Sequence, residues 1–164
     1  MKKLGIILFI LITGCLIFSN DFAVRSDGSV VELLNDGTWK EYEIETDDGL
    51  IQMEIGVPYL VEQYGEKYLV TVEKIERTRN EYSFYFIVNN KSSETKIFNN
   101  FFVEATDINY YSVSNDIMDS TNTGDIRING TKRCIFVYPT KKDLIELNIY
   151  GTYFDLTNTP IINK

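Results

Sequence analysis

Apolar and polar residues alternate along much of this chain, and the alternation is most regular close to its C-terminal end. The odd positions Ile145, Leu147 and Ile149 are aliphatic, whereas Glu146 and Asn148 between them are polar. Side chains of a β-strand point to opposite faces of a sheet in turn. This run is therefore expected to form a strand whose odd side chains face a core.

Several further runs have the same character and are separated by turn residues. The expected strands are 58–63, 68–76, 82–88, 101–106, 110–113 and 131–138. Between them lie turn sequences rich in glycine, asparagine and aspartate, which accept turn conformations readily: Tyr64-Gly65-Glu66-Lys67, 89–93 and Asp107-Ile108-Asn109. Short strands at this spacing, without an apolar helical period, predict an all-β antiparallel sandwich or barrel over 53–164. The polar stretch 114–124 is expected to be a loop.

A smaller unit precedes this domain. Residues 29–34 and 38–44 read as strands on either side of Asn35-Asp36-Gly37, and an Asp-Gly pair favours a tight turn. We therefore expect a β-hairpin and an acidic linker to make up the region 20–52, with the linker over 45–52. An isolated hairpin is marginally stable, so this unit must pack on the main domain or on a partner.

The first fifteen residues show a different pattern. Met1-Lys2-Lys3 is followed by the apolar run 4–12 and then by Thr13-Gly14-Cys15. A short basic start followed by an apolar run of this length is typical of an export signal, which we place at 1–19. The protein is accordingly expected to be exported from the cytoplasm.

This signal can end in two ways. The small residues before Cys15 resemble a bacterial lipoprotein signal, in which the chain is cut before the cysteine and the cysteine carries lipid. Alternatively, the apolar run continues through Leu16-Ile17-Phe18, and an ordinary signal peptidase cuts near Ser19 or Ala23. The first ending predicts a membrane-anchored lipoprotein, and the second a soluble periplasmic or secreted protein. An uncleaved anchor is disfavoured, because the run is shorter than the ~20 residues of a membrane span.

The net charge of the chain limits the kinds of partner that it is expected to bind. The 164 residues include 16 lysines and arginines against 24 acidic residues, giving a formal charge of −8. Loss of Lys2 and Lys3 with the signal would bring the charge to −10, because no acidic residue precedes Asp21. An acidic surface repels phosphate backbones and anionic lipid. We therefore expect no nucleic-acid partner, and membrane contact only through a lipid anchor.

The residue types needed for much of catalysis are missing. The chain has no histidine, and Cys15 and Cys134 are its only cysteines. A Ser-His-Asp triad and a histidine or cysteine metal site are thereby excluded. Cys134 lies in an apolar strand pattern and is expected to be a buried thiol. The acidic residues around 114–125 match no calcium loop, and no phosphate-binding glycine loop is present. We expect no catalytic residue, metal or cofactor, and hence no enzyme.

The order of the runs is similar to that of a known family. The chain carries a strand ending in Asn-Asn-Lys-Ser, then Phe-x-Val-x-Ala-x-Asp-x-x-x-Tyr, then Asn129-Gly130, then Cys134-Ile135-Phe136-Val137-Tyr138-Pro139, and finally Leu144-Ile145-Glu146-Leu147. This order resembles bacterial extracellular immunoglobulin-like domains, which are often mislabelled as telomeric-repeat-binding factors. The resemblance covers residues 68–150. It implies an antiparallel immunoglobulin-like β-sandwich, a signal or lipid anchor, and no assigned catalytic residues.

Surface recognition is the function that these observations leave open. We expect a non-enzymatic, exported protein of the bacterial cell envelope that binds an unknown protein partner there. The candidate interaction residues are Trp39, Tyr110 and Tyr111, with Phe98 and Phe102 as further aromatic candidates, although packing in the core competes with this interpretation for each of them. The alternative is a small-ligand or carbohydrate-binding module that uses exposed aromatic side chains such as Trp39.

Overall fold

The computed structural model describes residues 21–25, 30–34, 36–41, 46–47, 49–121 and 124–164. In these ranges the chain forms β-strands, turns and one 3₁₀-helix, and no α-helix. The all-β class expected from the alternation is thus confirmed. No helix within the described ranges has the length and hydropathy that a membrane span needs.

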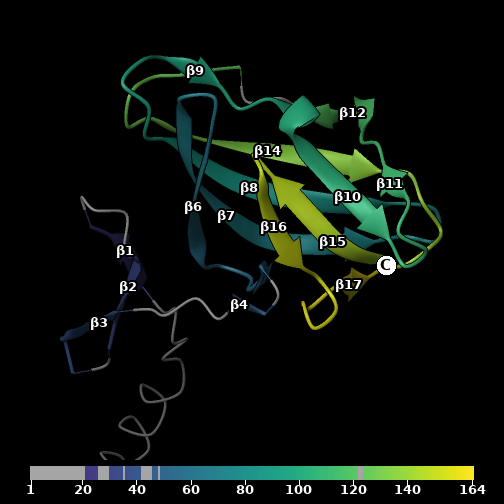
Figure 1. The fold of residues 1–164 in the computed structure, drawn as a ribbon, viewed down its shortest axis with the longest axis horizontal. Helices are drawn as coiled ribbons and strands as arrows, with labels where there is room; N and C mark the ends of the chain where they lie inside the picture. Colours follow the sequence, from purple (N-terminus) through teal and green to yellow (C-terminus); the bar gives the residue numbers. More distant parts are fainter. Residues whose placement is uncertain (1–20, 26–29, 35, 42–45, 48, 122–123) are drawn as a thin grey trace, which may run out of the picture.

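Two sheets form the main body of the described part of the chain (Figure 1). The first sheet has the strand order β11 (Ser112–Val113), β10 (Val103–Asp107), β15 (Leu144–Ile149), β16 (Thr152–Asp155), β5 (Leu50–Gln52) and β4 (Thr46–Asp47). The second has the order β12 (Asp116–Thr121), β14 (Thr131–Tyr138), β8 (Tyr82–Asn90), β7 (Glu66–Arg77) and β17 (Ile162–Asn163), and β6 (Pro58–Gln63) also pairs with β7. Described neighbours are antiparallel except in two parallel pairs, β5 with β16 and β7 with β17.

The core lies between these two sheets and is rich in aromatic side chains. The ring of Tyr59, from the second sheet, meets that of Phe154, from the first, edge to face at 4.8 Å between centroids. The buried Tyr138 hydroxyl donates to the carbonyl oxygen of Val103 at 2.9 Å and so joins β14 to β10. The two sheets therefore pack face to face as a β-sandwich around one core. The immunoglobulin-like order of its connections stays a prediction.

A small antiparallel sheet precedes the sandwich and contains the expected hairpin. Its strands are β1 (Asp21–Val24), β2 (Val30–Leu33) and β3 (Trp39–Glu41), in that order. The chain turns between β2 and β3, where Gly37 has a φ of 81° and the Leu34 N–H donates to the Thr38 carbonyl at 2.8 Å. Phe22 of β1 packs against the main core, so this unit is attached to the sandwich as the instability of a free hairpin requires.

Three segments differ from the sequence-based expectation because of strand pairing. Leu50–Gln52, expected in a linker, forms β5, which pairs with β16 far along the chain. Asp116–Thr121, expected in a loop, forms β12 at the edge of the second sheet. In β15, a register shift opposite Thr106 and Asp107 leaves Ile145 half-buried and turns Leu144 into the core. Each difference depends on pairing with a distant strand, which local alternation does not report.

The end of the described chain is held by an ion cluster around Glu76. This β7 carboxylate accepts hydrogen bonds from Lys164 Nζ at 2.8 Å, Lys74 Nζ at 2.6 Å and Tyr85 Oη at 2.6 Å. These three donors outweigh the effect of burial and lower the pKa of Glu76 to about 2. The cluster joins Lys164, which follows β17, to the end of the neighbouring strand β7.

Acid should weaken the fold through this carboxylate, and Glu76→Gln should remove that part of the pH dependence. A carboxyl group whose pKa is lowered by folding stabilises the folded state above its unfolded pKa, here 4.5, and loses this effect as the pH falls towards 2. We expect the urea midpoint of the wild type to exceed that of E76Q at about pH 6, and the gap to shrink below about pH 4.5. A gap that stays constant down to about pH 2.5 would contradict this assignment.

Candidate functional site

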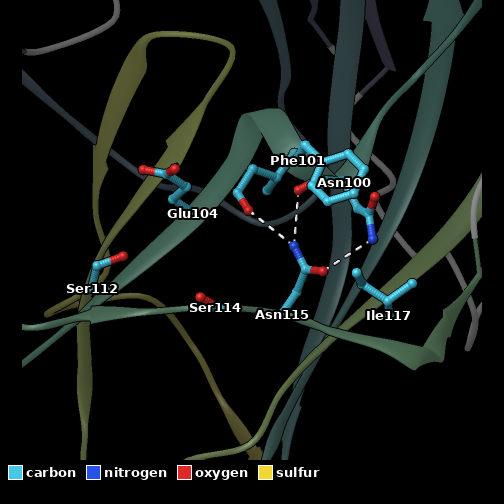
Figure 2. A pocket seen from close by; sticks show the side chains of 8 residues that line it. Asn100, Phe101, Glu104, Ser112, Ser114, Asn115 and Ile117 are labelled. Carbon is cyan, nitrogen blue, oxygen red and sulfur yellow. Dashed lines mark hydrogen bonds between the residues drawn. The ribbon is translucent and has the colours of Figure 1, made fainter.

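A surface cavity of about 250 Å³ lies at one edge of the sandwich. It sits between β10, the 3₁₀-helix η1 (Asn100–Phe102), and the chain that leads from β11 in one sheet to β12 in the other. Its lining residues are Asn100, Phe101, Val103, Glu104, Ser112, Ser114, Asn115 and Ile117 (Figure 2). The lining thus combines apolar side chains with amides, hydroxyls and one carboxylate, and it contains no lysine or arginine.

The amide of Asn115 fixes the geometry of this cavity. Its Nδ2 donates to the carbonyl oxygens of Asn100 at 2.8 Å and Val103 at 3.3 Å, and its Oδ1 accepts from Asn100 Nδ2 at 3.0 Å (Figure 2). One side chain on the segment that enters β12 therefore holds η1 and the start of β10 in place. Because every polar atom of the Asn115 amide is used internally, this residue serves as a brace rather than as a free binding group.

Three large apolar side chains are exposed at or beside the cavity. Phe101 of η1 is 66% exposed, and Ile117 and Met118 of β12 are 57% and 91% exposed. Phe101 and Ile117 line the cavity itself, and Met118 follows Ile117 directly. We call these three residues the apolar rim. Large apolar groups gathered at one exposed place on a folded protein mark an interaction site more often than a solvated surface.

An irregular pairing of β12 projects two of these side chains outward. Asp116 pairs with Val137 and Thr121 with Ile135, so that residues 117–120 stand opposite Phe136 alone. The hydroxyls of Ser120 and Thr121 accept from the N–H groups of Val137 at 2.9 Å and Ile135 at 3.0 Å. These two hydroxyls therefore serve as the hydrogen-bond acceptors for the N–H groups at this edge of β14. The bulged segment does not need to pair regularly here, and Ile117 and Met118 are exposed on it.

Phe101 is held by a buried neighbour in the same segment. This segment follows β9 (Lys96–Ile97), which pairs with β13 (Asp125–Ile126). Phe98 is fully buried among core aromatic rings, and the N–H of Asn99 donates to the Tyr150 hydroxyl at 2.7 Å. The Asn99 side chain caps η1 by accepting from the Phe101 N–H at 3.0 Å. The exposed Phe101 ring is therefore presented by a fixed backbone rather than by a free loop.

The predicted pair Tyr110 and Tyr111 lies next to the cavity but outside its lining. Both side chains are exposed in the turn from β10 to β11, where Tyr110 has a φ of 63°. Burial would raise the pKa of Asp107, but N–H bonds from Tyr111 and Asn109 and the nearby Lys142 outweigh it and hold that pKa below its usual value. Lys142 Nζ also lies 5.3 Å from the centre of the Tyr111 ring. The turn is thus rigid and adjoins Ser112.

The other predicted residues lie elsewhere. Trp39 is half-exposed on β3, in the small sheet away from β11 and β12 (Figure 1), so the structure does not bring it together with the two tyrosines. Cys15 falls outside the described residues. Phe98 is buried, so the prediction that it is an interaction residue is wrong. Phe102 is half-buried. Burial raises the pKa of Cys134 to about 12, so this thiol stays protonated at neutral pH.

No described group of three or more cysteine or acidic side chains is close enough to hold a metal ion.

The sequence pattern does not identify the apolar rim. The sequence pattern places Phe101 with Val103 in one alternating strand, and it places Ile117 and Met118 in a polar loop. An apolar pair inside an otherwise polar stretch was the one signal that pointed to this surface.

Comparison with known proteins adds no relative: no family model, no curated protein and no solved structure matches this chain.

Proposed function

We propose that the protein is a non-enzymatic, exported module of the bacterial cell envelope that recognises another protein through the apolar rim. The observation that carries this proposal is the exposure of Phe101 and Ile117 at one cavity, with the exposed Met118 directly after Ile117. Full burial of one such side chain contributes ~1.5–3 kcal/mol, and a few aromatic or aliphatic anchors usually dominate the affinity of an interface. Three of them on a fixed scaffold are enough to anchor a protein interface.

The rigidity of the site supports this proposal. The Asn115 brace and the buried Phe98 hold the rim before any partner arrives. A surface that is already ordered loses less conformational freedom on binding, and this favours affinity. The location in the envelope rests on the export pattern of residues 1–19, and a lipid on Cys15 would keep the domain close to the membrane.

The location is tested by the intact mass of the protein from membrane and soluble fractions of its native host. Residues 15–164 carrying acyl chains, found in the membrane fraction, are the expected result for a lipoprotein. A bare chain starting near Asn20 or Val24 in the soluble fraction would discard the anchor and keep the export. The full-length chain in the cytoplasm would overturn the envelope role.

The interaction is tested by photo-crosslinking in the native host. Phe101→p-benzoylphenylalanine should form a covalent adduct with one envelope protein, because the ring at this position would lie inside the interface. The matched control places the same group at Tyr153, an exposed aromatic residue of β16 outside the cavity lining. An adduct at position 101 and none at 153 is expected, whereas equal labelling at both positions would contradict a binding surface at the rim.

A further inference from the structure

The apolar rim is surrounded by negative charge. Glu104 lines the cavity and is exposed on β10, and Asp116 and Asp119 flank the two apolar residues of β12. The Asp116 carboxylate accepts from the N–H groups of Met118 at 2.8 Å and Asp119 at 3.4 Å, which places it at the base of the bulge. We call these three residues the acidic border. The apolar anchors therefore have carboxylates beside them, and the cavity lining contains no cationic side chain.

The carboxylates of the acidic border are not neutralised by a neighbouring cation, whereas several other acids of the described chain are. Glu73 is held by Arg133 at 3.0 Å, Asp143 by Arg77 at 2.6 Å, and Asp107 by Lys142 at 3.1 Å. No such ion pair to a described lysine or arginine is formed by a member of the border. Like charges around an apolar site select partners of the opposite sign, because a matched partner is attracted and an acidic one is repelled.

Two other occupants fit this surface poorly. A second copy, also of formal charge −8, would bring a second acidic border against the first if it used the same face. An added strand would need a regular row of N–H and C=O groups, but the bulge of residues 117–120 breaks the edge of β12. The acidic border instead favours recognition by side chains of a partner with the opposite charge.

We propose that the rim and its border bind a cationic protein segment, in which an apolar side chain enters the cavity and flanking lysines or arginines meet Glu104, Asp116 and Asp119. This inference rests on the proposed function and specifies its partner class. The cavity is large enough to hold one side chain. The hydroxyls of Ser112 and Ser114 in its lining can form hydrogen bonds with the backbone of the bound segment.

The test uses labelled peptides of about ten residues and fluorescence anisotropy with the full chain in non-ionic detergent. The probe alternates lysine with leucine, and two control peptides alternate lysine with serine and glutamate with leucine. We expect the lysine–leucine peptide to bind at least about tenfold more tightly than either control, and to lose about tenfold in affinity when low salt is raised to physiological salt.

Matched variants separate this surface from the overall charge of the protein. The combination Glu104→Gln, Asp116→Asn and Asp119→Asn should weaken binding by about tenfold or more, and Phe101→Ser should do the same without changing charge. Asparagine at position 116 keeps an oxygen that can accept the N–H bonds of the bulge, so folding should be preserved. The control combination Glu62→Gln, Glu81→Gln and Glu94→Gln removes the same charge elsewhere and should change affinity less than about twofold.

Three results would overturn the proposal: equal loss in both triple variants, equal binding of the lysine–serine peptide, or no effect of Phe101→Ser. The first two would reduce the interaction to general charge attraction. These failures differ from failure of the proposed function. If position 101 crosslinks to a protein in the host while the protein shows no preference for the lysine–leucine peptide, the proposed binding function is kept and the cationic nature of its partner is rejected. If position 101 forms no crosslink, the proposed function falls with its partner.

Discussion

Replacement of Phe98 by alanine is expected to lower the free energy of unfolding by about 4 kcal/mol, the largest effect of any substitution considered. The Phe98 ring lies 5.0 Å from that of Tyr150, 5.2 Å from Tyr68 and 5.9 Å from Phe136, measured between centroids. It comes from the crossing segment after β9 and fills the space between the sheets. Its loss would leave a cavity that rigid strands on both sides cannot close.

Urea denaturation followed by circular dichroism measures this effect. Phe98→Leu should cost clearly less than Phe98→Ala, because leucine fills more of the space. Phe101→Ala is the matched control, since the same residue type three positions later is two-thirds exposed and should change stability by less than about 0.5 kcal/mol. Similar losses for Phe98→Ala and Phe101→Ala would show that Phe98 is not the anchor described above.

The second large effect is expected at Asn90, where alanine should cost about 3 kcal/mol. This fully buried amide donates to the carbonyl oxygens of Glu94 at 2.7 Å and Ile126 at 2.8 Å, and its oxygen accepts from the Ser92 N–H at 2.8 Å. The Asn90 side chain therefore connects the turn after β8 to β13 through hydrogen bonds. Alanine would leave these backbone groups without partners, including the buried carbonyl of Ile126, and each such loss costs ~1–3 kcal/mol.

Two variants make this prediction specific. Asn109→Ala removes an exposed asparagine side chain from another turn and should be close to neutral in urea denaturation. Asn90→Asp keeps the shape and one acceptor, but it removes both donors and buries a charge, so it should destabilise at least as much as alanine at neutral pH. A neutral outcome for Asn90→Ala would mean that water replaces the lost bonds and that the site is not sealed.

Local features of the chain predicted much of the fold. The alternation on either side of Tyr64-Gly65 predicted the hairpin of β6 and β7, and both turn residues have the positive φ values, 53° and 76°, that a two-residue turn requires. The Asp36-Gly37 pair likewise marked the turn between β2 and β3. Such turns are decided by neighbouring residues, and this is why a sequence pattern identifies them.

The features that escaped prediction depend on contacts between distant residues. Leu50–Gln52 forms a strand because it pairs with the edge of β16. The acidic residues next to it in the sequence resemble a linker, and they therefore conceal this strand from a local pattern. The rim escaped for the same reason. Whether Ile117 points inward or outward is decided by the register of β12 against β14, and the bulge in that pairing has no signature in the residues that form it.

The parallel pairing of β5 with β16 has a consequence for how the protein is made. Gln52 and Asp155 are joined by a hydrogen bond across 103 residues of sequence, and β17 likewise returns to β7. Long-range pairings form late and slowly, because a long loop must close before any contact rewards it. A chain that emerges N-terminus first cannot complete its first sheet until β16 has emerged. The chain therefore stays open through most of its synthesis.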